Sequence, residues 1–465
     1  MKPARRLEGT IVVPGDKSIS HRALMLAAIA EGESRLEGLA DGADVASTLA
    51  AVRALGVEVV TGADGDSPGG EDADRSSGAT SPAARSPARR LRHRWSGPLT
   101  ARVGGAGLDG LREASRPIDC GNSGTTVRLL AGILAGQPFA TVLTGDGSLR
   151  RRPMRRVAGP LQAMGATVET TRGGTAPLRI RGRRPLRGIV HRPEVASAQI
   201  KSCVLLAGLF AAEPTTVEEP ARTRDHSERR LAAMGARIDA GPAGDAWSVR
   251  IEPPARLASL SGRVPADVSS AAYWVAAAAL LPGSRLELPG LGLNPTRTAF
   301  LDVLRGWGAG IEIEPAVDWH GEPVGVIRVR GGDEPLTGGG IEPSMVAGLI
   351  DELPLLAAIG PLTADGVEIR GAAELRVKES DRIAAIAAAL RALGAEVDEF
   401  PDGLAVGGGQ RLLAGTIEAR GDHRIALAMA AVGLAAAGPV IIAGAEAMAV
   451  SYPGFAAALE EVAVR

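Results

Sequence analysis

Residues 164–168 read Met-Gly-Ala-Thr-Val, and phrases of this kind recur along the chain: an apolar residue, then glycine, a small residue and a β-favouring run. The five glycines stand at positions 56, 165, 235, 308 and 394. A glycine after an apolar helical stretch is typical of the residue that ends a helix, and a β-like run after it favours a strand. Each phrase therefore predicts a helix that turns directly into a strand.

A second recurring feature lies upstream of these phrases, where a polar or small-residue loop opens an Ala/Leu-rich helix. The loops lie at residues 16–22, 122–126, 196–201, 266–270, 351–354 and 422–424. The spacings between the glycines are 109, 70, 73 and 86 residues. A period near 70 residues predicts six copies of one helix–strand–connection–helix–strand unit, rather than a chance likeness among Ala/Gly-rich segments.

The first spacing is about 36 residues too long, and the excess coincides with a low-complexity stretch at about 63–97. This stretch is acidic first and basic later, and it has no large aliphatic residue before Leu91. Such a composition buries too little apolar surface to order itself. We expect a disordered insertion in a surface hairpin, with a docking segment as the alternative.

Six units divide naturally into two sets of three. The Pro-rich stretch 252–254 and the segment 264–267 mark the boundary. The sequence thus predicts an α/β protein with two similar halves, and clefts between such halves are where small ligands bind.

The composition of the 465 residues excludes several classes of protein. The hydrophobic share of 45% supports a folded core, and the net charge of -1 argues against a basic nucleic-acid binder. Aromatic residues make up only 3%, too few for stacking platforms. The two cysteines, Cys120 and Cys203, fit a reducing cytosol rather than a disulfide scaffold.

Targeting, membrane and cofactor signals are weak. The N-terminus has no apolar run typical of a signal peptide. The uncharged stretch 426–445 is broken by Gly438-Pro439, which favours a helix, a turn and a buried strand over a membrane span. The six histidines have no metal-ligand spacing, and no dinucleotide or Walker motif is present. We expect a cytoplasmic, monomeric protein without cofactor or metal, and without nucleic-acid or membrane partners.

Lysine is rare: 52 residues are Lys or Arg, and only four of them are lysines. Lysine has a compact ammonium with a tunable pKa, whereas arginine is a permanently charged planar fork. Lysines that persist in an Arg-rich chain are therefore candidates for chemistry that arginine does not support. Apart from Lys2, these are Lys17, Lys201 and Lys378.

Cationic residues gather at the predicted helix starts. Ser18 as N-cap would place Arg22 one turn into a helix whose N-terminus favours anions, beside Lys17. Residues 150–156 hold five arginines. Lys378 and Arg382, four residues apart, would share one helix face. This pattern predicts ligands that carry several negative charges.

Carboxylates lie among these cations, notably Asp351 and Glu379. Anion binding alone does not need carboxylates, which indicates proton transfer.

The motifs in this order resemble those of the 5-enolpyruvylshikimate-3-phosphate synthase family, over the whole chain except the insertion. The matching stretches are residues 14–22, 119–126, 145–149, 152–154, 197–202, 376–382 and 421–424. The resemblance implies two domains of three βαβαββ units each, an inverse α/β barrel. It places residues 15–263 in one domain and residues 1–14 with 264–465 in the other. Family members join shikimate 3-phosphate to phosphoenolpyruvate and release phosphate, without metal or cofactor.

The resemblance also implies roles for individual residues. Shikimate 3-phosphate would be held by Lys17, Ser18, Arg22, Ser197, Gln199, Asp351 and Lys378. Phosphoenolpyruvate would be held by Lys17, Gly124, Arg152, Gln199, Arg382 and Arg424. Catalysis would use Asp351 as proton acceptor for the 5-hydroxyl, and Glu379 with Lys378 for proton transfer at the enol carbon. Lys17 is the fourth catalytic candidate. Weaker candidates for the site are Asn122, Thr125, Arg128, Lys201 and Arg224. We expect Lys17→Arg or Lys378→Arg to cripple catalysis and leave the fold intact.

This chain departs from the family pattern at a few positions. Val450 stands where many relatives have a lysine that contacts phosphoenolpyruvate, and Ala198, Glu374 and Leu129 replace serine, asparagine and proline of some relatives. Gly124, in place of alanine, leaves room beside phosphoenolpyruvate and predicts ordinary sensitivity to glyphosate.

Two other functions remain open. UDP-N-acetylglucosamine enolpyruvyl transferase shares this resemblance, but it usually relies on a cysteine in a mobile loop, and the corresponding loop, residues 145–156, has none. The second is a non-catalytic anion-binding protein, against which Asp351, Lys378 and Glu379 argue.

Overall fold

The computed structural model describes residues 1–63 and 99–465. Nearly all of the predicted insertion at about 63–97 lies outside the described residues. The described chain forms six sheets flanked by helices, a mixed architecture that confirms the predicted α/β class.

Three four-stranded sheets come from residues up to 263, in the orders β13-β2-β4-β3, β5-β6-β8-β7 and β11-β12-β10-β9. Their strands are β2 (Glu31–Leu39), β3 (Glu58–Ala63), β4 (Leu99–Ala106), β5 (Ile118–Asp119), β6 (Ala140–Thr144), β7 (Thr167–Glu169), β8 (Leu178–Arg181), β9 (Val190–His191), β10 (Thr215–Glu219), β11 (Ile238–Ala243), β12 (Ala246–Ile251) and β13 (Ser261–Arg263).

The other sheets have the orders β15-β16-β14-β1-β23, β17-β18-β20-β19 and β21-β22. Their strands are β1 (Arg6–Thr10), β14 (Arg285–Gly292), β15 (Gly310–Trp319), β16 (Glu322–Arg330), β17 (Gly339–Ile341), β18 (Val367–Ile369), β19 (Val397–Phe400), β20 (Gly403–Val406), β21 (Gly415–Glu418), β22 (Val440–Ala443) and β23 (Ala463–Val464).

One pairing pattern repeats in five of these sheets: a parallel pair followed by two antiparallel pairs. In the β5-β6-β8-β7 sheet, for example, β5 and β6 are parallel, and β8 pairs antiparallel with both β6 and β7. The β13, β9, β1 and β17 strands open the same pattern in the other four. A parallel pair requires a crossover, and the helices supply it.

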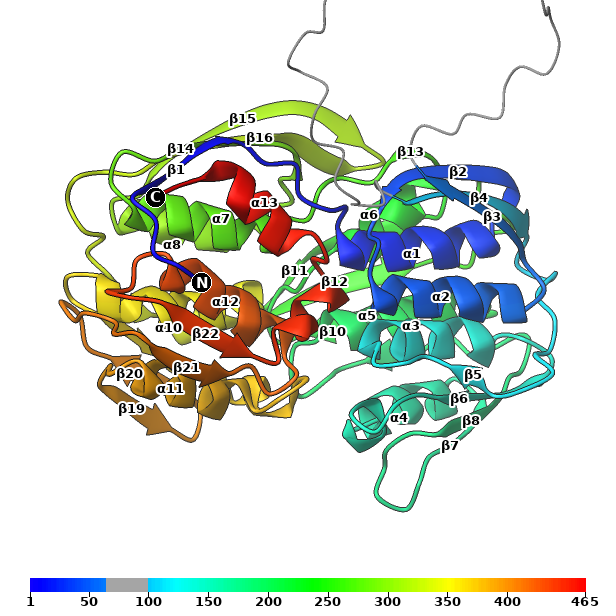
Figure 1. Cartoon of the computed structure of the whole chain (residues 1–465). Coiled ribbons are helices and arrows are strands. Elements are labelled where there is room, and N and C mark those ends of the chain that lie inside the picture. The colour runs from blue at the N-terminus through cyan, green and yellow to red at the C-terminus, as the bar shows by residue number, and fades with distance from the viewer. Residues whose placement is uncertain (64–98) are drawn as a thin grey trace, which may run out of the picture.

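The helices lie between and beside these sheets (Figure 1). They are α1 (Lys17–Ala28), α2 (Ala43–Ala54), α3 (Gly124–Ala135), α4 (Arg155–Ala163), α5 (Ala198–Gly208), α6 (His226–Ala233), α7 (Val268–Leu280), α8 (Ala299–Gly306), α9 (Val346–Leu349), α10 (Leu353–Ile359), α11 (Arg382–Ala392), α12 (His423–Gly433) and α13 (Phe455–Val462), with short 3-10 turns at Leu149–Arg151, Pro343–Met345, Gly360–Leu362, Ala373–Val377 and Ala445–Val450.

The predicted phrases are confirmed. The glycines at 56, 165, 235, 308 and 394 follow α2, α4, α6, α8 and α11, and their φ angles lie between 85° and 103°, the left-handed region that glycine adopts without strain. A strand follows each of them. The six predicted helix starts are also present, as α1, α3, α5, α7, α10 and α12.

Two predictions about helix starts are wrong. The N-cap of α1 is Asp16, whose Oδ1 accepts a hydrogen bond from the backbone N–H of Ile19 at 2.8 Å, so Ser18 lies inside the helix. Helix α11 begins only at Arg382, because Asp381 caps it. Lys378 precedes the helix and does not share a helix face with Arg382.

Buried apolar side chains form two separate cores. The first core takes residues between 19 and 264, and the second takes residues 7–13 and residues between 266 and 462. Strand β1 therefore lies among the elements of the second core, although it opens the chain (Figure 1).

Within residues 1–63 and 99–465, no single helix has the length and hydropathy needed to cross a membrane. Two helical segments, Pro343–Leu349 and Leu353–Leu362, meet these criteria only together, across a bend of 110°. The uncharged stretch 426–445 contains most of α12, a loop and β22, as predicted.

Candidate active site

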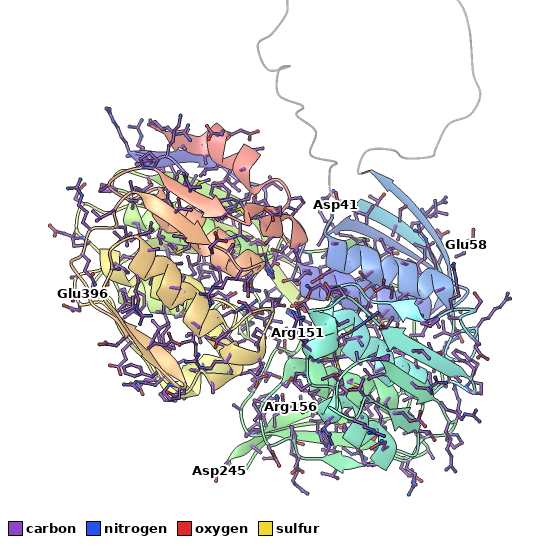
Figure 2. All side chains as sticks on the ribbon, turned by 60° about the horizontal axis from the view of Figure 1, so that its bottom comes forward. Asp41, Glu58, Arg151, Arg156, Asp245 and Glu396 are labelled. Atoms are coloured by element: carbon purple, nitrogen blue, oxygen red, sulfur yellow. The ribbon has the colours of Figure 1, made fainter. Side chains whose placement is uncertain are left out.

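A cavity of about 340 Å³ lies between the two cores. Its lining comes from residues 17–224 on the side of the first core and residues 343–424 on the side of the second. Arg151 and Arg156 lie on the edge of the first group of elements that faces the second (Figure 2). A ligand in this cavity therefore touches both parts of the molecule.

Helix N-termini open onto this cavity. The first residues of α1, α3, α5 and α12 lie at or beside its lining, which includes Lys17, Gly124, Ala198 and His423. Side chains cap three of these helices: Asp16, Ser123 and Asp422 accept hydrogen bonds from backbone N–H groups of the first turn. Unpaired N–H groups and the helix dipole make such termini favourable places for anions.

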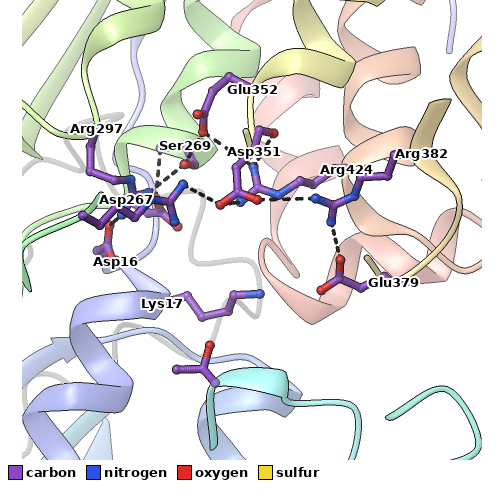
Figure 3. Close-up of polar contacts among 12 residues, drawn as sticks. Asp16, Lys17, Asp267, Ser269, Arg297, Asp351, Glu352, Glu379, Arg382 and Arg424 are labelled. Carbon is purple, nitrogen blue, oxygen red and sulfur yellow. Dashed lines mark hydrogen bonds and ion pairs between the residues drawn. The ribbon is translucent and has the colours of Figure 1, made fainter. Parts of the chain in front are cut away.

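Arg382 is the centre of a buried charge network (Figure 3). Its Nε lies 2.9 Å from Asp422 Oδ2, its Nη2 lies 2.5 Å from Glu379 Oε2, and its Nη1 lies 3.4 Å from Asp351 Oδ1. Arg152 Nη1 approaches the other Glu379 oxygen at 3.6 Å. The network holds arginines beside the cavity with their forks directed by carboxylates.

Asp351 is held by two more arginines. Arg224 Nη2 lies 2.5 Å from Asp351 Oδ2, and Arg424 Nη2 lies 3.2 Å from the same oxygen. Arg424 Nη1 also donates to the Asp351 backbone carbonyl at 2.9 Å. Arg224 belongs to the first side of the cavity and Arg424 to the second, so Asp351 joins the two sides.

These contacts fix the protonation of the carboxylates. Although burial acts to raise the pKa of Asp351, the guanidinium groups of Arg424, Arg224 and Arg382 hold that pKa well below its usual range. Burial likewise opposes ionisation of Glu379, but Arg382 and Arg152 keep its pKa well below the ordinary value. Both groups are therefore ionised at neutral pH.

Lys378 shows the opposite effect. Burial lowers the pKa of its ammonium below the ordinary 10.5, and the nearby Asp351 carboxylate only partly offsets this. A lysine with a lowered pKa gives up and regains its proton more readily, which suits proton transfer.

Two further contacts shape the first side of the cavity. Lys17 Nζ lies 3.0 Å from Asp44 Oδ2. Arg128 Nη1 donates to Gln199 Oε1 at 2.6 Å, and Gln199 Nε2 donates to Thr125 Oγ1 at 3.1 Å. These bonds orient both Lys17 and Gln199 at the cavity wall.

The cavity brings together most of the predicted residues. Its lining contains Lys17, Ser18, Gly124, Thr125, Arg128, Arg152, Ser197, Gln199, Arg224, Asp351, Lys378, Glu379, Arg382 and Arg424. It also contains Ala198 and Glu374. Arg156 Nη1 donates to both carboxylate oxygens of Glu374 across the cleft, at 3.2 Å each.

Arg22, Asn122 and Lys201 lie outside the lining. Arg22 is buried behind it and donates to Ser227 Oγ, Ser202 Oγ and the Ser18 carbonyl, at 2.8–3.0 Å. Asn122 Oδ1 accepts from Arg152, so it orients an arginine that does line the cavity.

Lys201 corrects a prediction. Its ammonium is fully buried and lies 2.8 Å from Glu219 Oε2 and 2.8 Å from Glu228 Oε1. This cluster belongs to the side of the first core and has no opening to the cavity, so Lys201 supports the fold rather than a ligand.

Asp44 and His423 are residues of the lining to which sequence reasoning gave no role. Asp44 had no local signal, because its partner Lys17 lies 27 residues away. His423 was quoted in a motif but given no role; burial lowers its pKa to about 3, so its ring is neutral at the cavity wall. Val450 is not part of the lining.

The cysteines are unsuited to covalent chemistry. Both are free and buried, and burial raises the pKa of each thiol to about 12. A thiol with such a pKa is a poor nucleophile at neutral pH.

A cleft lined by arginines, lysines and ionised carboxylates from two α/β halves is that of an enzyme that acts on anionic substrates. A family model for EPSP synthase (3-phosphoshikimate 1-carboxyvinyltransferase) matches residues 1–70 and 91–459. The chain belongs to this family, and it is a transferase of that activity.

Individual relatives agree. The 3-phosphoshikimate 1-carboxyvinyltransferase of Gloeobacter violaceus is 48% identical over 456 residues, which cover 97% of this chain and 96% of the relative. That of Desulforudis audaxviator is 47% identical over 461 residues, covering 99% and 98%.

Solved structures give the same result. EPSP synthase from Acinetobacter baumannii superposes with a TM-score of 0.81 at 36% identity, covering 100% of this chain and 98% of that one. The enolpyruvyl transferase NikO from Streptomyces tendae superposes with a TM-score of 0.73, but at 17% identity this likeness concerns the fold alone.

Proposed function

We propose that the cleft holds shikimate 3-phosphate and phosphoenolpyruvate together and transfers the enolpyruvyl group to the 5-hydroxyl of the former. The observation that carries this proposal is the meeting of Lys17 and Arg224 from one side with Asp351, Lys378 and the arginines of the other in one cavity. Both substrates carry several negative charges, which these cations match.

The two substrates divide the lining between them. Shikimate 3-phosphate contacts Lys17, Ser18, Ser197, Gln199, Asp351 and Lys378, with Arg224 as a further ligand and Arg22 close behind the wall. Phosphoenolpyruvate lies against Gly124 and contacts Lys17, Gln199, Arg152, Arg382 and Arg424, with Arg128 beside it. Because position 450 is not a lysine, these arginines and Lys17 supply the cationic contacts to phosphoenolpyruvate.

The chemistry is an addition followed by an elimination. The 5-hydroxyl oxygen bonds to C2 of phosphoenolpyruvate, its proton passes to Asp351, and C3 gains a proton from the Lys378–Glu379 pair to become a methyl group. In the second step the methyl group returns a proton to the Lys378–Glu379 pair, and the C2–O bond to phosphate breaks. The proton taken up by Asp351 passes to the leaving phosphate, so that the enol ether and inorganic phosphate leave and both acid–base groups are restored. Closed walls exclude water from the tetrahedral intermediate.

Substrate binding itself would activate Asp351. The arginines that depress its pKa are the groups that we propose for substrate anions. When phosphate and carboxylate oxygens take over these guanidinium groups, less positive charge remains for Asp351, and its basicity rises. The base is then strongest when both substrates are present.

We extend the proposal to the architecture. Six βαβαββ units form an inverse α/β barrel in two domains, residues 15–263 and residues 1–14 with 264–465. The recurring strand order and the two separate cores support this division. We also propose a monomer in the cytoplasm, which acts as a glyphosate target; light scattering of the purified protein tests the monomer.

Phosphate release tests the function. We expect release when the protein is mixed with shikimate 3-phosphate and phosphoenolpyruvate, and none with phosphoenolpyruvate alone. Release with UDP-N-acetylglucosamine as the only acceptor would favour the sister enzyme. Binding of both substrates without release would leave an anion-binding protein.

A further inference from the structure

The described chain crosses between the two cores twice, and the crossings lie side by side. One crossing is at residues 14–16 and the other at residues 265–267. Asp16 N–H donates to the Pro265 carbonyl at 2.7 Å, and Asp267 N–H donates to the Pro14 carbonyl at 2.8 Å. Any rotation of one half against the other must pass through this pair of segments.

Arg297 spans both crossings. Its guanidinium is buried, and its Nη1 lies 2.8 Å from Asp16 Oδ2 while its Nη2 lies 3.1 Å from Asp267 Oδ1. Each of these carboxylates also caps a helix, Asp16 that of α1 and Asp267 that of α7. One planar cation thus joins the first helix on one side of the cleft to a helix on the other.

The contacts of Arg297 with Asp16 and Asp267 lead to the cavity on both sides (Figure 3). On one side, Asp16 is followed directly by Lys17. On the other, Arg297 Nη2 donates to Ser269 Oγ at 2.7 Å, and Ser269 Oγ donates to Glu352, the residue after Asp351. Two contacts therefore link Arg297 to Glu352, the neighbour of the proposed base, and one contact links it to Asp16, the neighbour of the proposed substrate lysine.

A second set of bonds fixes Arg297 itself. Its Nη1 contacts His226 Nε2 at 3.0 Å, and His226 Nδ1 lies 2.7 Å from Glu322 Oε1. Because arginine only donates, Nε2 accepts and the ring proton lies on Nδ1, directed to Glu322. Asn294 Nδ2 donates to Glu322 at 2.8 Å and to Asp225 at 2.7 Å, so the turn that carries Arg297 is tied to the first side.

We propose that Arg297 is a positioning residue that clamps the two crossings and thereby sets Lys17 against Asp351 across the cleft. It touches neither substrate, because it does not line the cavity. The inference rests on the proposed function for its kinetic consequence, whereas its consequence for the shape of the molecule does not.

The planar fork is what the site requires. The Arg297 guanidinium donates to two carboxylates and one hydroxyl because its N–H groups diverge at fixed angles. A lysine ammonium does not provide this planar arrangement of donors. Arg297→Lys keeps the charge and loses the fork, and Arg297→Gln loses both. Phe300→Leu is a matched structural control, because Phe300 lies in the same segment, is buried in the second core and is an apolar core side chain.

The experiment compares these variants with the wild type in kcat, both KM values, Tm and the radius of gyration from small-angle scattering. We expect Arg297→Gln to lower kcat by about 10- to 100-fold, as for a misplacement of about 1 Å, and to increase the radius of gyration. Arg297→Lys should recover part of both. Phe300→Leu should lower Tm and leave kcat and the radius unchanged.

Several outcomes would overturn the clamp: kcat within about twofold of wild type in folded Arg297→Gln, or an equal loss of kcat in Phe300→Leu at matched Tm. If Arg297→Gln does not fold, Arg297→Gln with Asp267→Asn removes one buried unpaired carboxylate and is measured instead. If the wild type releases no phosphate, the proposed function fails, and an unchanged radius of gyration in the variant separately overturns the clamp.

Discussion

Lys201 and Lys378 are both lysines beside carboxylates, but their ammonium groups have different surroundings. Lys201 is fully buried between Glu219 and Glu228, each 2.8 Å away, within the side of the first core. Lys378 is half-buried, lines the cavity and faces Asp351. The first cluster is closed to ligands and the second is open to them.

The difference appears in the protonation of the two lysines. For Lys201, burial acts to lower the pKa, but Glu228 and Glu219 outweigh it and the pKa is raised. For Lys378, burial prevails and the pKa is lowered. Two carboxylates thus stabilise the protonated ammonium of Lys201. The arginines around Asp351 offset the negative charge of that carboxylate, so it stabilises the ammonium of Lys378 less. The buried ammonium of Lys201 therefore stabilises the fold, whereas the ammonium of Lys378, which lines the cavity, remains available for proton transfer.

The largest effect should come from Asp351→Asn, which keeps the volume of the side chain and removes the base. We expect kcat to fall by about 10²- to 10⁴-fold, the usual contribution of a positioned acid or base. Asp398→Asn, an exposed site in β19, is the control. A variant that keeps a third of the wild-type kcat would show that the open cluster binds but does not take the proton.

Gly124→Ala tests the geometry of the open cluster. A Cβ at this position would come within 2.8 Å of Arg128 Nη1 and 2.9 Å of Arg152 Nη1, so both guanidinium groups must move. Losing a charge-assisted hydrogen bond of about 1.5–3 kcal/mol should raise KM for phosphoenolpyruvate by about 10- to 100-fold. Gly159→Ala, where a Cβ meets nothing within 4 Å, should leave KM unchanged; equal KM values in the two variants would refute this account.

The pH profile should show Lys378. Because its pKa is lowered from 10.5, its ammonium is lost as pH rises through a value below that, and kcat/KM should fall there. The sign for stability is opposite: burial disfavours the charged form, so this cost is present at lower pH and relieved as pH rises. Lys378→Arg, with a guanidinium that stays charged, should lack the alkaline limb at low residual activity. An unchanged alkaline limb in Lys378→Arg would show that another group causes the fall in kcat/KM at high pH.

The smallest effect concerns the pair of Arg156 and Glu374 across the cleft. Both side chains are partly exposed, and such pairs contribute at most about 1 kcal/mol. Glu374→Asn should therefore raise the KM values for the two substrates by at most about fivefold at low ionic strength, and the effect should vanish in high salt. Glu368→Gln removes a similar pair with Arg370, 2.8 Å long and away from the cavity, and should change nothing. A salt-independent rise in KM would contradict the electrostatic explanation.

The fold was largely predictable from local signals. Glycines that end helices and polar residues that begin them act within a few residues, so the five phrases and six helix starts could be located. The same locality explains the errors. Asp16 and Ser18 are both good caps, and only the folded backbone distinguishes them; Asp381 starts α11 later than the spacing of Lys378 and Arg382 suggested.

The site was predictable only in part. Resemblance pointed to many residues of the cavity lining, but not to their pairing. Asp44 beside Lys17, and Arg297 between Asp16 and Asp267, depend on contacts up to 281 residues apart, for which local pattern gives no signal. Lys201 was misjudged for the same reason, since its partners Glu219 and Glu228 lie in other elements.

Parallel measurement of kcat and Tm for Lys378→Met and Lys201→Met tests the central contrast most directly. For Lys378→Met we predict a loss in kcat of about 100-fold or more with a Tm close to that of the wild type. For Lys201→Met we predict a destabilisation of about 3–5 kcal/mol, because two buried carboxylates lose their partner, with kcat of the folded enzyme within about twofold. The reverse pattern, an active Lys378→Met or a folded but inactive Lys201→Met, would contradict the account.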